Sequence, residues 1–226
     1  MVIIEEKTVD AVKVGLLGLG TVGGGTATVL IRNADEIQAR VGRPIEISHA
    51  AALDIASQKI LDPAKTKLTE DAFDVVADPD VDIVVELIGG YTLAKDLVLK
   101  AIENGKHVVT ANKALIATHG PEIMKAASAQ GVSVCYEAAV AGGIPIIKAM
   151  REGLSANRIQ WVAGIINGTG NFILSEMRDK GRDFGDVLRE AQELGYAEAD
   201  PTFDVEGIDA AHKLTILNSL AFGVEL

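Results

Sequence analysis

The chain has 226 residues and a formal net charge of −11, and 48% of its residues are hydrophobic but only 4% are aromatic. This acidic composition argues against binding to nucleic acid and against anchoring on anionic membranes, because both need a basic surface. A single cysteine excludes an internal disulfide, and no apolar run approaches the ~18 residues of a membrane span, so we expect a cytoplasmic protein.

The first part of the chain alternates short apolar strands with helical stretches. Strands are predicted at residues 12–17, 45–53, 83–90, 107–115 and 132–140. Helices are predicted between them, at 21–40, after Asp54, and at 69–77, 93–104 and 121–130. This alternation predicts an α/β fold with a Rossmann-type, doubly wound parallel sheet, although no run stands out as the third strand of its first half.

The pattern changes after residue 145. Helices are predicted at 145–153, 168–180, 184–194 and 208–222, with one strand at 158–166 and a polar loop at 195–207. A lone strand cannot close a sheet layer. We therefore expect a dinucleotide-binding Rossmann domain at residues 1–145 and, at 146–226, part of an α+β substrate-binding and catalytic domain.

A glycine cluster directly follows the first predicted strand. Gly18, Gly20 and Gly23 form the pattern G-x-G-x-x-G between a strand and a helix. In a dinucleotide-binding loop the first glycine allows a tight turn, the second lets a pyrophosphate approach, and the third lets helix and strand pack closely. The loop, which also contains Leu19, Thr21 and Val22, is the predicted cofactor site, and a turn without a ligand is the alternative.

The end of the second strand should select between NAD and NADP. An acid there binds a free ribose 2′-hydroxyl, whereas an Arg accommodates a 2′-phosphate. Residues 50–54 contain Asp54 and no Arg, which favours NAD. The alternative is that Asp54 caps the helix predicted after it.

Two further loops follow strands at the carboxyl edge of the sheet, where open α/β sheets bind their ligands. They are Ile88–Tyr91 and Thr110–Lys113. At this edge Lys113 could contact cofactor or substrate, and could carry a proton if desolvation lowered its pKa. A solvated surface lysine is the alternative.

Acidic residues crowd the segment from Tyr196 to Lys213. Asp209 and Lys213 are spaced i, i+4 on the last predicted helix and share a face. One interpretation is a charged pocket in which carboxylates bind an ammonium and a lysine moves a proton. The other is a solvated acidic loop with a surface ion pair. The acidic residues are Glu198, Asp200, Asp204, Glu206 and Asp209.

Histidine and cysteine do not suggest a transition-metal or nucleophile site. The four histidines lack the spacing of metal ligands, and His212 is rotated away from Lys213 on its helix, so we expect it to be structural. Cys135 stands in the middle of an apolar strand and is expected to be a buried, inert thiol.

Five motifs together resemble homoserine dehydrogenase of the bacterial type, and they cover essentially the whole chain in the family's order. The resemblance implies an NAD- or NADP-dependent oxidoreductase that interconverts L-homoserine and L-aspartate 4-semialdehyde in threonine and methionine biosynthesis. It also implies a homo-oligomeric parent enzyme of which this chain is the N-terminal part. The motifs are GLGTVG at 18–23, TANKAL at 110–115, EAAVAGGIPII at 137–147, NGTGNFI at 167–173 and GYAEADPTFDVEGIDAAHK at 195–213.

The resemblance also implies roles for single residues. Lys213 matches the lysine that donates and accepts the proton at the substrate oxygen, and Lys113 matches a second active-site lysine near substrate and nicotinamide. Glu198 and Asp209, with Asp204 close by, match the substrate-binding carboxylates, and Gly195 matches a glycine that contacts the cofactor.

The resemblance also implies a sodium site at residues 137–144, near the end of the first predicted domain. The Glu137 side chain and the carbonyls of Val140, Gly142 and Ile144 match its oxygen ligands, which suit a hard cation. A plain Gly-Gly bend is the alternative.

Two other functions are compatible with the residues. A semialdehyde-type dehydrogenase would need a reactive cysteine in the site, and the position of Cys135 within a strand argues against it. A truncated, non-catalytic dinucleotide-binding module would bind cofactor without turnover.

Overall fold

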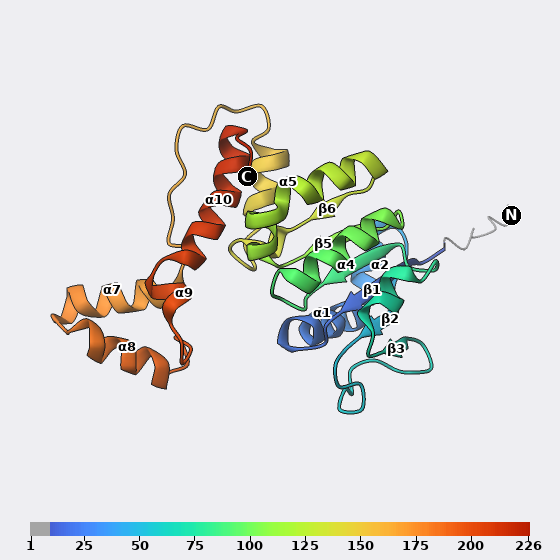
Figure 1. The fold of residues 1–226 in the computed structure, drawn as a ribbon, viewed down its shortest axis with the longest axis horizontal. Helices are drawn as coiled ribbons and strands as arrows, with labels where there is room; N and C mark the ends of the chain where they lie inside the picture. The colour runs from blue at the N-terminus through green and yellow to red at the C-terminus, as the bar shows by residue number, and fades with distance from the viewer. Residues whose placement is uncertain (1–9) are drawn as a thin grey trace, which may run out of the picture. The chain divides into compact units, whose positions relative to one another are not determined.

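The computed structural model describes residues 10–226, which divide into two compact units (Figure 1). The sheet unit comprises the residues up to Leu115 together with His119–Tyr136, and the helical unit comprises Ile116–Thr118 and Glu137–Leu226. The domain boundary predicted after residue 145 lies further along the chain and remains a prediction.

The sheet unit is built on one parallel sheet, as the strand–helix alternation predicts. Within residues 10–226 its strand order is β3-β2-β1-β4-β5-β6. The chain starts in the centre at β1, runs outward to β3, and returns to β4 on the other side of β1. The point between β1 and β4 is therefore the topological switch point, where doubly wound sheets bind ligands. The strands are β1 (Val12–Leu17), β2 (Ile45–Ala51), β3 (Lys67–Thr69), β4 (Ile83–Glu86), β5 (His107–Thr110) and β6 (Val134–Cys135).

Helices cover both faces of this sheet. Successive side chains of a strand point to opposite faces. Val14 and Leu16 of β1 pack in one cluster with Ala27 of α1 (Thr21–Arg32). Gly15 between them faces α3 (Ala72–Ala77), where a Cβ at Gly15 would lie 2.6 Å from Val75 Cγ1. Helices α1 and α3 therefore lie on opposite faces of β1.

The helices of the sheet unit differ from the predicted ones at three places. The helix predicted at 21–40 is broken at Asn33 into α1 and α2 (Ala34–Val41). The predicted helical stretch after Asp54 is wrong, because residues 54–66 form turns in which Asp54 and Asp62 accept backbone hydrogen bonds. Helix α4 (Thr92–Glu103) agrees with its prediction, whereas α5 (Lys113–Gln130) begins well before Pro121.

The strand that contains Cys135 is shorter than predicted, and the expectation of a buried thiol is wrong. Strand β6 has two residues and pairs only with β5, at the edge of the sheet. Alternation along the strand turns Val134 into the core and Cys135 to the opposite face, where its side chain is exposed.

The helical unit contains two helix pairs. Helices α7 (Gly168–Lys180) and α8 (Phe184–Glu193) enclose a small apolar core of Ile173, Val187, Ala191 and Ala197. Helix α9 (Thr202–Val205) lies within the predicted polar loop and packs against α10 (Ile208–Phe222), whose bounds agree with the prediction. Shorter elements precede them, namely η1 (Glu137–Ala139), α6 (Ile146–Lys148) and the π-helix η2 (Ala149–Gly153).

The strand predicted at 158–166 is not formed. This segment has no regular secondary structure, and Trp161 and Ile165 are 74% and 78% exposed. A strand needs a partner for its backbone N–H and C=O groups, and no strand of residues 10–226 pairs with this segment. The prediction of a strand at 158–166 is therefore wrong.

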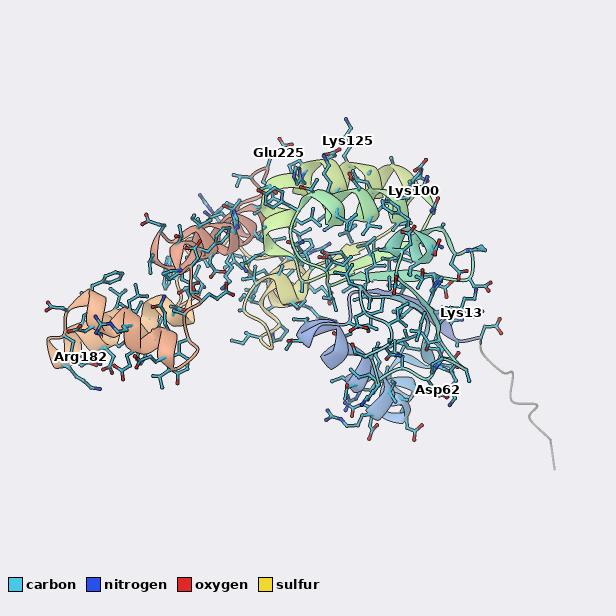
Figure 2. All side chains as sticks on the ribbon, turned by 60° about the horizontal axis from the view of Figure 1, so that its bottom comes forward. Lys13, Asp62, Lys100, Lys125, Arg182 and Glu225 are labelled. Atoms are coloured by element: carbon cyan, nitrogen blue, oxygen red, sulfur yellow. The ribbon has the colours of Figure 1, made fainter. Side chains whose placement is uncertain are left out.

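Charged side chains are spread over the described surface. Figure 2 shows Lys100 of α4 and Lys125 of α5 extending away from their helices. Among the described residues, no helix is both long and apolar enough to span a membrane.

Candidate active site

The glycine loop has a geometry that explains each glycine of its pattern. Gly18 has φ +94°, a conformation that L side chains rarely adopt, and its Cβ would lie 2.8 Å from Leu87 O. A Cβ at Gly23 would lie 1.9 Å from Gly18 O, so helix α1 could not approach the loop this closely with any side chain there. A Cβ at Gly20 would meet nothing within 4 Å, so this part of the loop faces open space.

Helix α1 begins inside this loop. Gly20 is its N-cap and provides no side chain to hydrogen-bond the first amides, and Gly24 N is the first to bond back, to Gly20 O at 2.7 Å. The first turn contains no acidic residue. Thr21 and Val22 therefore lie in a turn whose free amides and positive dipole end suit an anion.

Asp54 lies in the loop that follows β2 and is exposed. Hydrogen bonds from the Ser57 side chain and amide, and a weaker one from the Ala56 amide, lower its pKa, and desolvation opposes them in part. Asp54 is therefore an anion near neutral pH. The predicted helix cap is wrong, since the carboxylate caps a turn and no helix follows it.

The loops after β4 and β5 are joined by side chains. Glu86, the last residue of β4, accepts hydrogen bonds from Ile88 N at 2.9 Å and from Thr110 Oγ1 at 2.6 Å. Asn112 Nδ2 donates to Gly90 O, and Asn112 Oδ1 accepts from Leu115 N at 3.1 Å as the N-cap of α5. The next residue along, Lys113, is the first of α5 and is partly buried.

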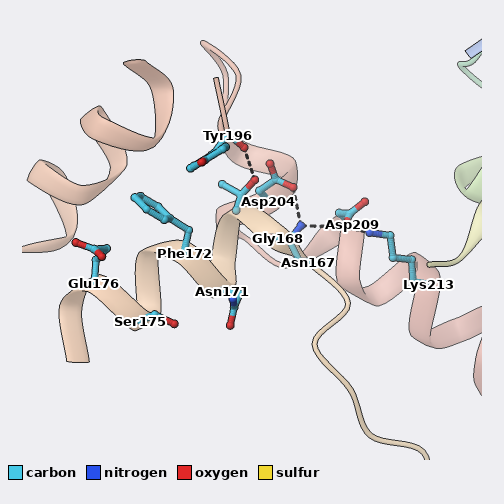
Figure 3. A pocket seen from close by; sticks show the side chains of 11 residues that line it. Asn167, Gly168, Asn171, Phe172, Ser175, Glu176, Tyr196, Asp204, Asp209 and Lys213 are labelled. Atoms are coloured by element: carbon cyan, nitrogen blue, oxygen red, sulfur yellow. Dashed lines mark hydrogen bonds and ion pairs between the residues drawn. The ribbon is translucent and has the colours of Figure 1, made fainter. Parts of the chain in front are cut away.

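In the helical unit, Lys213 and two of the predicted carboxylates come together. Lys213 Nζ lies 2.7 Å from Asp209 Oδ2 and donates to Ile166 O at 2.7 Å. Asn167 Nδ2 donates to Asp204 Oδ1 at 2.7 Å and to Asp209 Oδ2 at 2.9 Å (Figure 3). The side chains of Lys213 and Asp209 are only 19% and 10% exposed, so this is not a solvated surface ion pair.

An open cavity of about 650 Å³ in the helical unit is lined at one end by Asn167, Asp204, Asp209 and Lys213. Its other wall comes from α7 and the loop after α8, with Phe172 and Tyr196 packed edge to face at 5.2 Å between ring centroids. Figure 3 shows Asn167 between the carboxylates of Asp204 and Asp209. Polar groups at one end and aromatic rings along the wall are typical of a small-molecule site.

Two other predicted residues of this unit lie outside that lining. Glu198 and Gly195 are on the loop after α8 and are both exposed. Gly195 has φ +75° and its N–H donates to Gln192 O at 3.1 Å, which ends the helix. The Glu198 carbonyl accepts from Gln192 Nε2 at 3.0 Å.

Asn167 is not among the residues predicted for the site, although it belongs to the motif at 167–173. Its Oδ1 accepts from Gly170 N at 2.6 Å and caps α7, while its amide group bonds the two carboxylates. An Asn directly before a helical run is a known N-cap signal and could have marked the position. The contact with Asp204 and Asp209, 37 and 42 positions away, carries no sequence signal.

The segment predicted to bind sodium is an unusual turn. Ala141 has φ +50°, a strained value for a residue with a side chain, and Gly143 has φ +85°. Glu137 Oε1 and Oε2 accept from Ile147 N and Lys148 N, each at 2.9 Å. Each oxygen keeps a second lone pair, so these hydrogen bonds leave the carboxylate able to bind a cation.

Histidine and cysteine form no cluster at this site. Within residues 10–226 there is no group of three or more His, Cys, Asp or Glu residues that could hold a metal ion. His212 is packed edge to face with Phe203 at 6.0 Å between ring centroids, and its buried Nδ1 has no partner in the described part of the chain.

Comparison with known proteins gives the same family for both parts of the chain. Residues 18–137 match the model of the homoserine dehydrogenase NAD binding domain, and residues 145–226 match the homoserine dehydrogenase family model. The homoserine dehydrogenase of Pseudomonas aeruginosa is 71% identical over 95% of this chain and 49% of its own, and that of Bacillus subtilis is 46% identical over 96% and 50%. The solved structure of a homoserine dehydrogenase from Thiobacillus denitrificans is 67% identical with a TM-score of 0.90, over 96% of this chain and 50% of its own. The chain thus spans about half the length of the curated relatives it matches.

Proposed function

The chain belongs to the homoserine dehydrogenase family, and on this premise we propose that it interconverts L-homoserine and L-aspartate 4-semialdehyde with NAD or NADP. The sheet unit would bind the dinucleotide, and the helical unit would bind the amino acid and move the proton. The observation that carries the proposal is the partly buried Lys213–Asp209 pair, which Asn167 joins to Asp204 at one end of a cavity.

Lys213 is the proposed proton donor and acceptor. An ammonium has three N–H groups, and Asp209 and Ile166 O take two of them. The third is left for the substrate oxygen. In the direction of reduction the ammonium would donate its proton to that oxygen, and in oxidation the neutral amine would take the hydroxyl proton as hydride leaves the carbinol carbon.

Carboxylates are proposed to bind the amino group of the substrate. Asn167 holds one oxygen of Asp204, so the other oxygen of that carboxylate can accept from an ammonium. Asp209 is proposed beside it because it matches the family motif. Glu198 is proposed as a third substrate-binding carboxylate because it matches the family motif. Together these groups suit a small zwitterion that carries a hydroxyl group.

The dinucleotide is proposed to bind along the carboxyl edge of the sheet. NAD(P), when bound, supplies the acceptor or donor of the hydride. The open backbone at Gly20 and the uncapped first turn of α1 would hold its pyrophosphate, with Gly18 and Gly23 setting the turn. Lys113 is proposed as the second active-site lysine, and Gly195 as a further cofactor contact. Leu19, Thr21 and Val22 complete the loop.

Between the two dinucleotides, the loop after β2 favours NAD. The anionic Asp54 can accept from a ribose 2′-hydroxyl and would repel a 2′-phosphate. Residues 50–58 contain no Arg or Lys that could bind a 2′-phosphate.

A sodium ion is proposed at the turn that Glu137 begins. Its ligands would be the Glu137 carboxylate and the carbonyl oxygens of Val140, Gly142 and Ile144, a donor set that suits a hard monovalent cation. The ion would fix the turn, and no chemical step passes through it.

The test is nicotinamide absorbance during incubation of the chain with L-homoserine and NAD, then with NADP. We expect a homoserine-dependent rise, larger with NAD. L-2-aminobutyrate, which lacks the hydroxyl group, is the matched control and should give none. Absence of a rise with L-homoserine under both dinucleotides would contradict the proposal for this chain.

The competing functions give different results in the same assay. Binding of NADH without turnover would favour a non-catalytic dinucleotide-binding module. A phosphate-dependent oxidation of L-aspartate 4-semialdehyde would favour a semialdehyde-type dehydrogenase. The exposure of Cys135 removes one argument against the latter, and family membership is what weighs against it.

A further inference from the structure

Glu86 is a carboxylate in an otherwise apolar strand, and the proposed mechanism does not use it. It ends β4 at the switch point of the sheet, and none of its surface is exposed. A buried carboxylate is costly unless hydrogen bonds compensate its charge. The groups that hydrogen-bond this carboxylate therefore indicate which part of the site it holds in place.

Three donors, in the loop after β4 and at the last residue of β5, hydrogen-bond the Glu86 carboxylate. Oε1 accepts from Ile88 N at 2.9 Å and from Gly89 N at 3.2 Å, in the loop after β4. Oε2 accepts from Thr110 Oγ1 at 2.6 Å, at the end of β5, a separation typical of a charge-assisted O–H···O⁻ bond. One carboxylate thus spans both loops.

The connection continues from Thr110 to the start of α5. Thr110 Oγ1 accepts from Asn112 N at 2.9 Å, and Asn112 in turn donates from its side chain to Gly90 O and caps the helix that begins with Lys113. Glu86 is therefore connected to Asn112 in two ways. One runs through the loop after β4, which ends in the bond to Gly90 O, and the other runs through the Thr110 hydroxyl.

The same network reaches the glycine loop. Leu87 N donates to Leu17 O at 2.9 Å, directly before Gly18, and a Cβ at Gly18 would lie 2.8 Å from Leu87 O. A shift of the loop after β4 would therefore move the backbone on which the dinucleotide loop rests.

We propose that Glu86 is a positioning residue: its buried carboxylate locks the loops after β4 and β5 together and so holds Lys113 and the glycine loop in their binding geometry. The role assigned to Lys113 rests on the proposed function, but the locking of the loops does not. Glu86 acts through Thr110 and Asn112 and has no contact with substrate in this proposal.

The test compares Glu86→Gln with the wild-type chain by hydrogen–deuterium exchange without ligand. Gln keeps the shape but loses the charge. When its one oxygen accepts from Ile88 N and Gly89 N, its NH₂ group faces Thr110 and can only donate, so the charge-assisted bond from the Thr110 hydroxyl is lost. We expect exchange of the amides at 88–90 and 112–115 to rise about tenfold, as the loss of one hydrogen bond to a charged group implies. NADH affinity, measured by fluorescence, should fall by a similar factor.

Thr110 provides a second variant in case Glu86→Gln does not fold. Thr110→Val removes the hydroxyl group at nearly constant volume and should reproduce both effects, whereas Thr110→Ser keeps the hydroxyl and should restore wild-type exchange. Unchanged exchange at these loops in Glu86→Gln and Thr110→Val would overturn the proposal.

Asp78 gives the matched control for burial of a carboxylate. It is also buried, at 8% exposure, and accepts from His49 and Lys67, but it precedes β4 at the amino edge of the sheet. Asp78→Asn should destabilise the chain without weakening NADH binding. If it weakens NADH binding as much as Glu86→Gln does, Glu86 is only a structural residue. The two proposals can fail separately. If Glu86→Gln alters exchange but the wild-type chain does not oxidise L-homoserine, only the proposed function is contradicted.

Discussion

The two units build their candidate sites from different material. At the edge of the sheet, backbone groups of the glycine loop and one buried carboxylate act within a few residues of strand ends. In the helical unit, the site consists of side chains that are far apart in sequence, such as Lys213 and Ile166, which are separated by 47 positions. The glycine loop is coded locally, whereas the pairing of Glu86 with Thr110 and the site of the helical unit exist only once the elements have packed.

The cores that support the two sites differ as well. One cluster of the sheet unit alone buries Val14, Leu16, Ile47, Ala50 and Val85 across three strands. The core between α7 and α8 has four buried residues, and Asn167 ties α7 to α9 and α10 through hydrogen bonds. Substitutions in the glycine loop should therefore change folding or dinucleotide binding, and those at the cavity of the helical unit should change turnover or substrate binding.

The largest effect is expected at Lys213. Lys213→Ala removes the proposed proton donor and should lower kcat by roughly 10²–10⁴-fold, with dinucleotide affinity unchanged. Steady-state kinetics and NADH fluorescence measure the two quantities. Lys100→Ala, which breaks the exposed pair with Glu103, is the control and should alter neither. Wild-type turnover in Lys213→Ala would remove the assigned role.

A substitution in the glycine loop should lower dinucleotide affinity, the quantity that Lys213→Ala leaves unchanged. Gly20→Ala adds a Cβ in open space at extended backbone, so the chain should fold normally, but the methyl group would stand where the pyrophosphate approaches. We expect NADH affinity to fall by roughly 100-fold, as overpacking by ~3 kcal/mol implies.

Two neighbouring glycines sharpen this test. Gly23→Ala clashes with Gly18 O and should lower the melting temperature as well as the affinity, whereas Gly25→Ala on α1 meets nothing and should stabilise the helix slightly. Equal affinities in Gly20→Ala and Gly25→Ala would mean that the loop does not approach the cofactor.

The next effect concerns the stability of the sheet unit and its dependence on pH. Burial tends to raise the pKa of Asp78, but hydrogen bonds from Lys67, Asp80 N and His49 lower it from 3.8 to about 2. A depressed carboxylate pKa contributes stability that is present above pH 4 and is lost as pH falls through about 2. Asp78→Asn should therefore lower the free energy of unfolding by about 2 kcal/mol at pH 7.

Urea unfolding between pH 7 and pH 2 measures the difference in free energy of unfolding between the wild-type chain and Asp78→Asn. This difference should become smaller as the pH approaches 2. Asp179→Asn is the control, because its partner Arg178 is exposed and exposed pairs contribute little. A difference that grows on acidification would contradict the assignment to Asp78.

The smallest effect is expected at Asn167. Asn167→Ala leaves Asp204 and Asp209 without their shared donor and should raise KM for L-homoserine by about tenfold, the equivalent of one hydrogen bond. Asn167→Asp keeps the cap of α7 but adds a third carboxylate, so it should not restore KM. Asp71→Ala, which removes the cap of α3, controls for the loss of a helix cap.

Several features could be predicted from the sequence because their causes are local. A run of β-branched residues followed by G-x-G-x-x-G predicts β1, the loop and α1, since only glycine accepts φ +94° at Gly18 and the close approach at Gly23. Helices α4 and α10 agree with the helical stretches predicted at residues 93–104 and 208–222. The i, i+4 spacing of Asp209 and Lys213 predicts that they meet on one helix face.

Tertiary structure alone decided the rest. Whether Cys135 is buried depends on which face of an edge strand it occupies, and whether residues 158–166 form a strand depends on a partner that residues 10–226 do not provide. The pairing of Glu86 with Thr110, and of Asn167 with two distant carboxylates, arises because packing removes these polar groups from water together. A polar side chain in the sequence carries a local propensity, but its partner is set by which segments the core brings into contact.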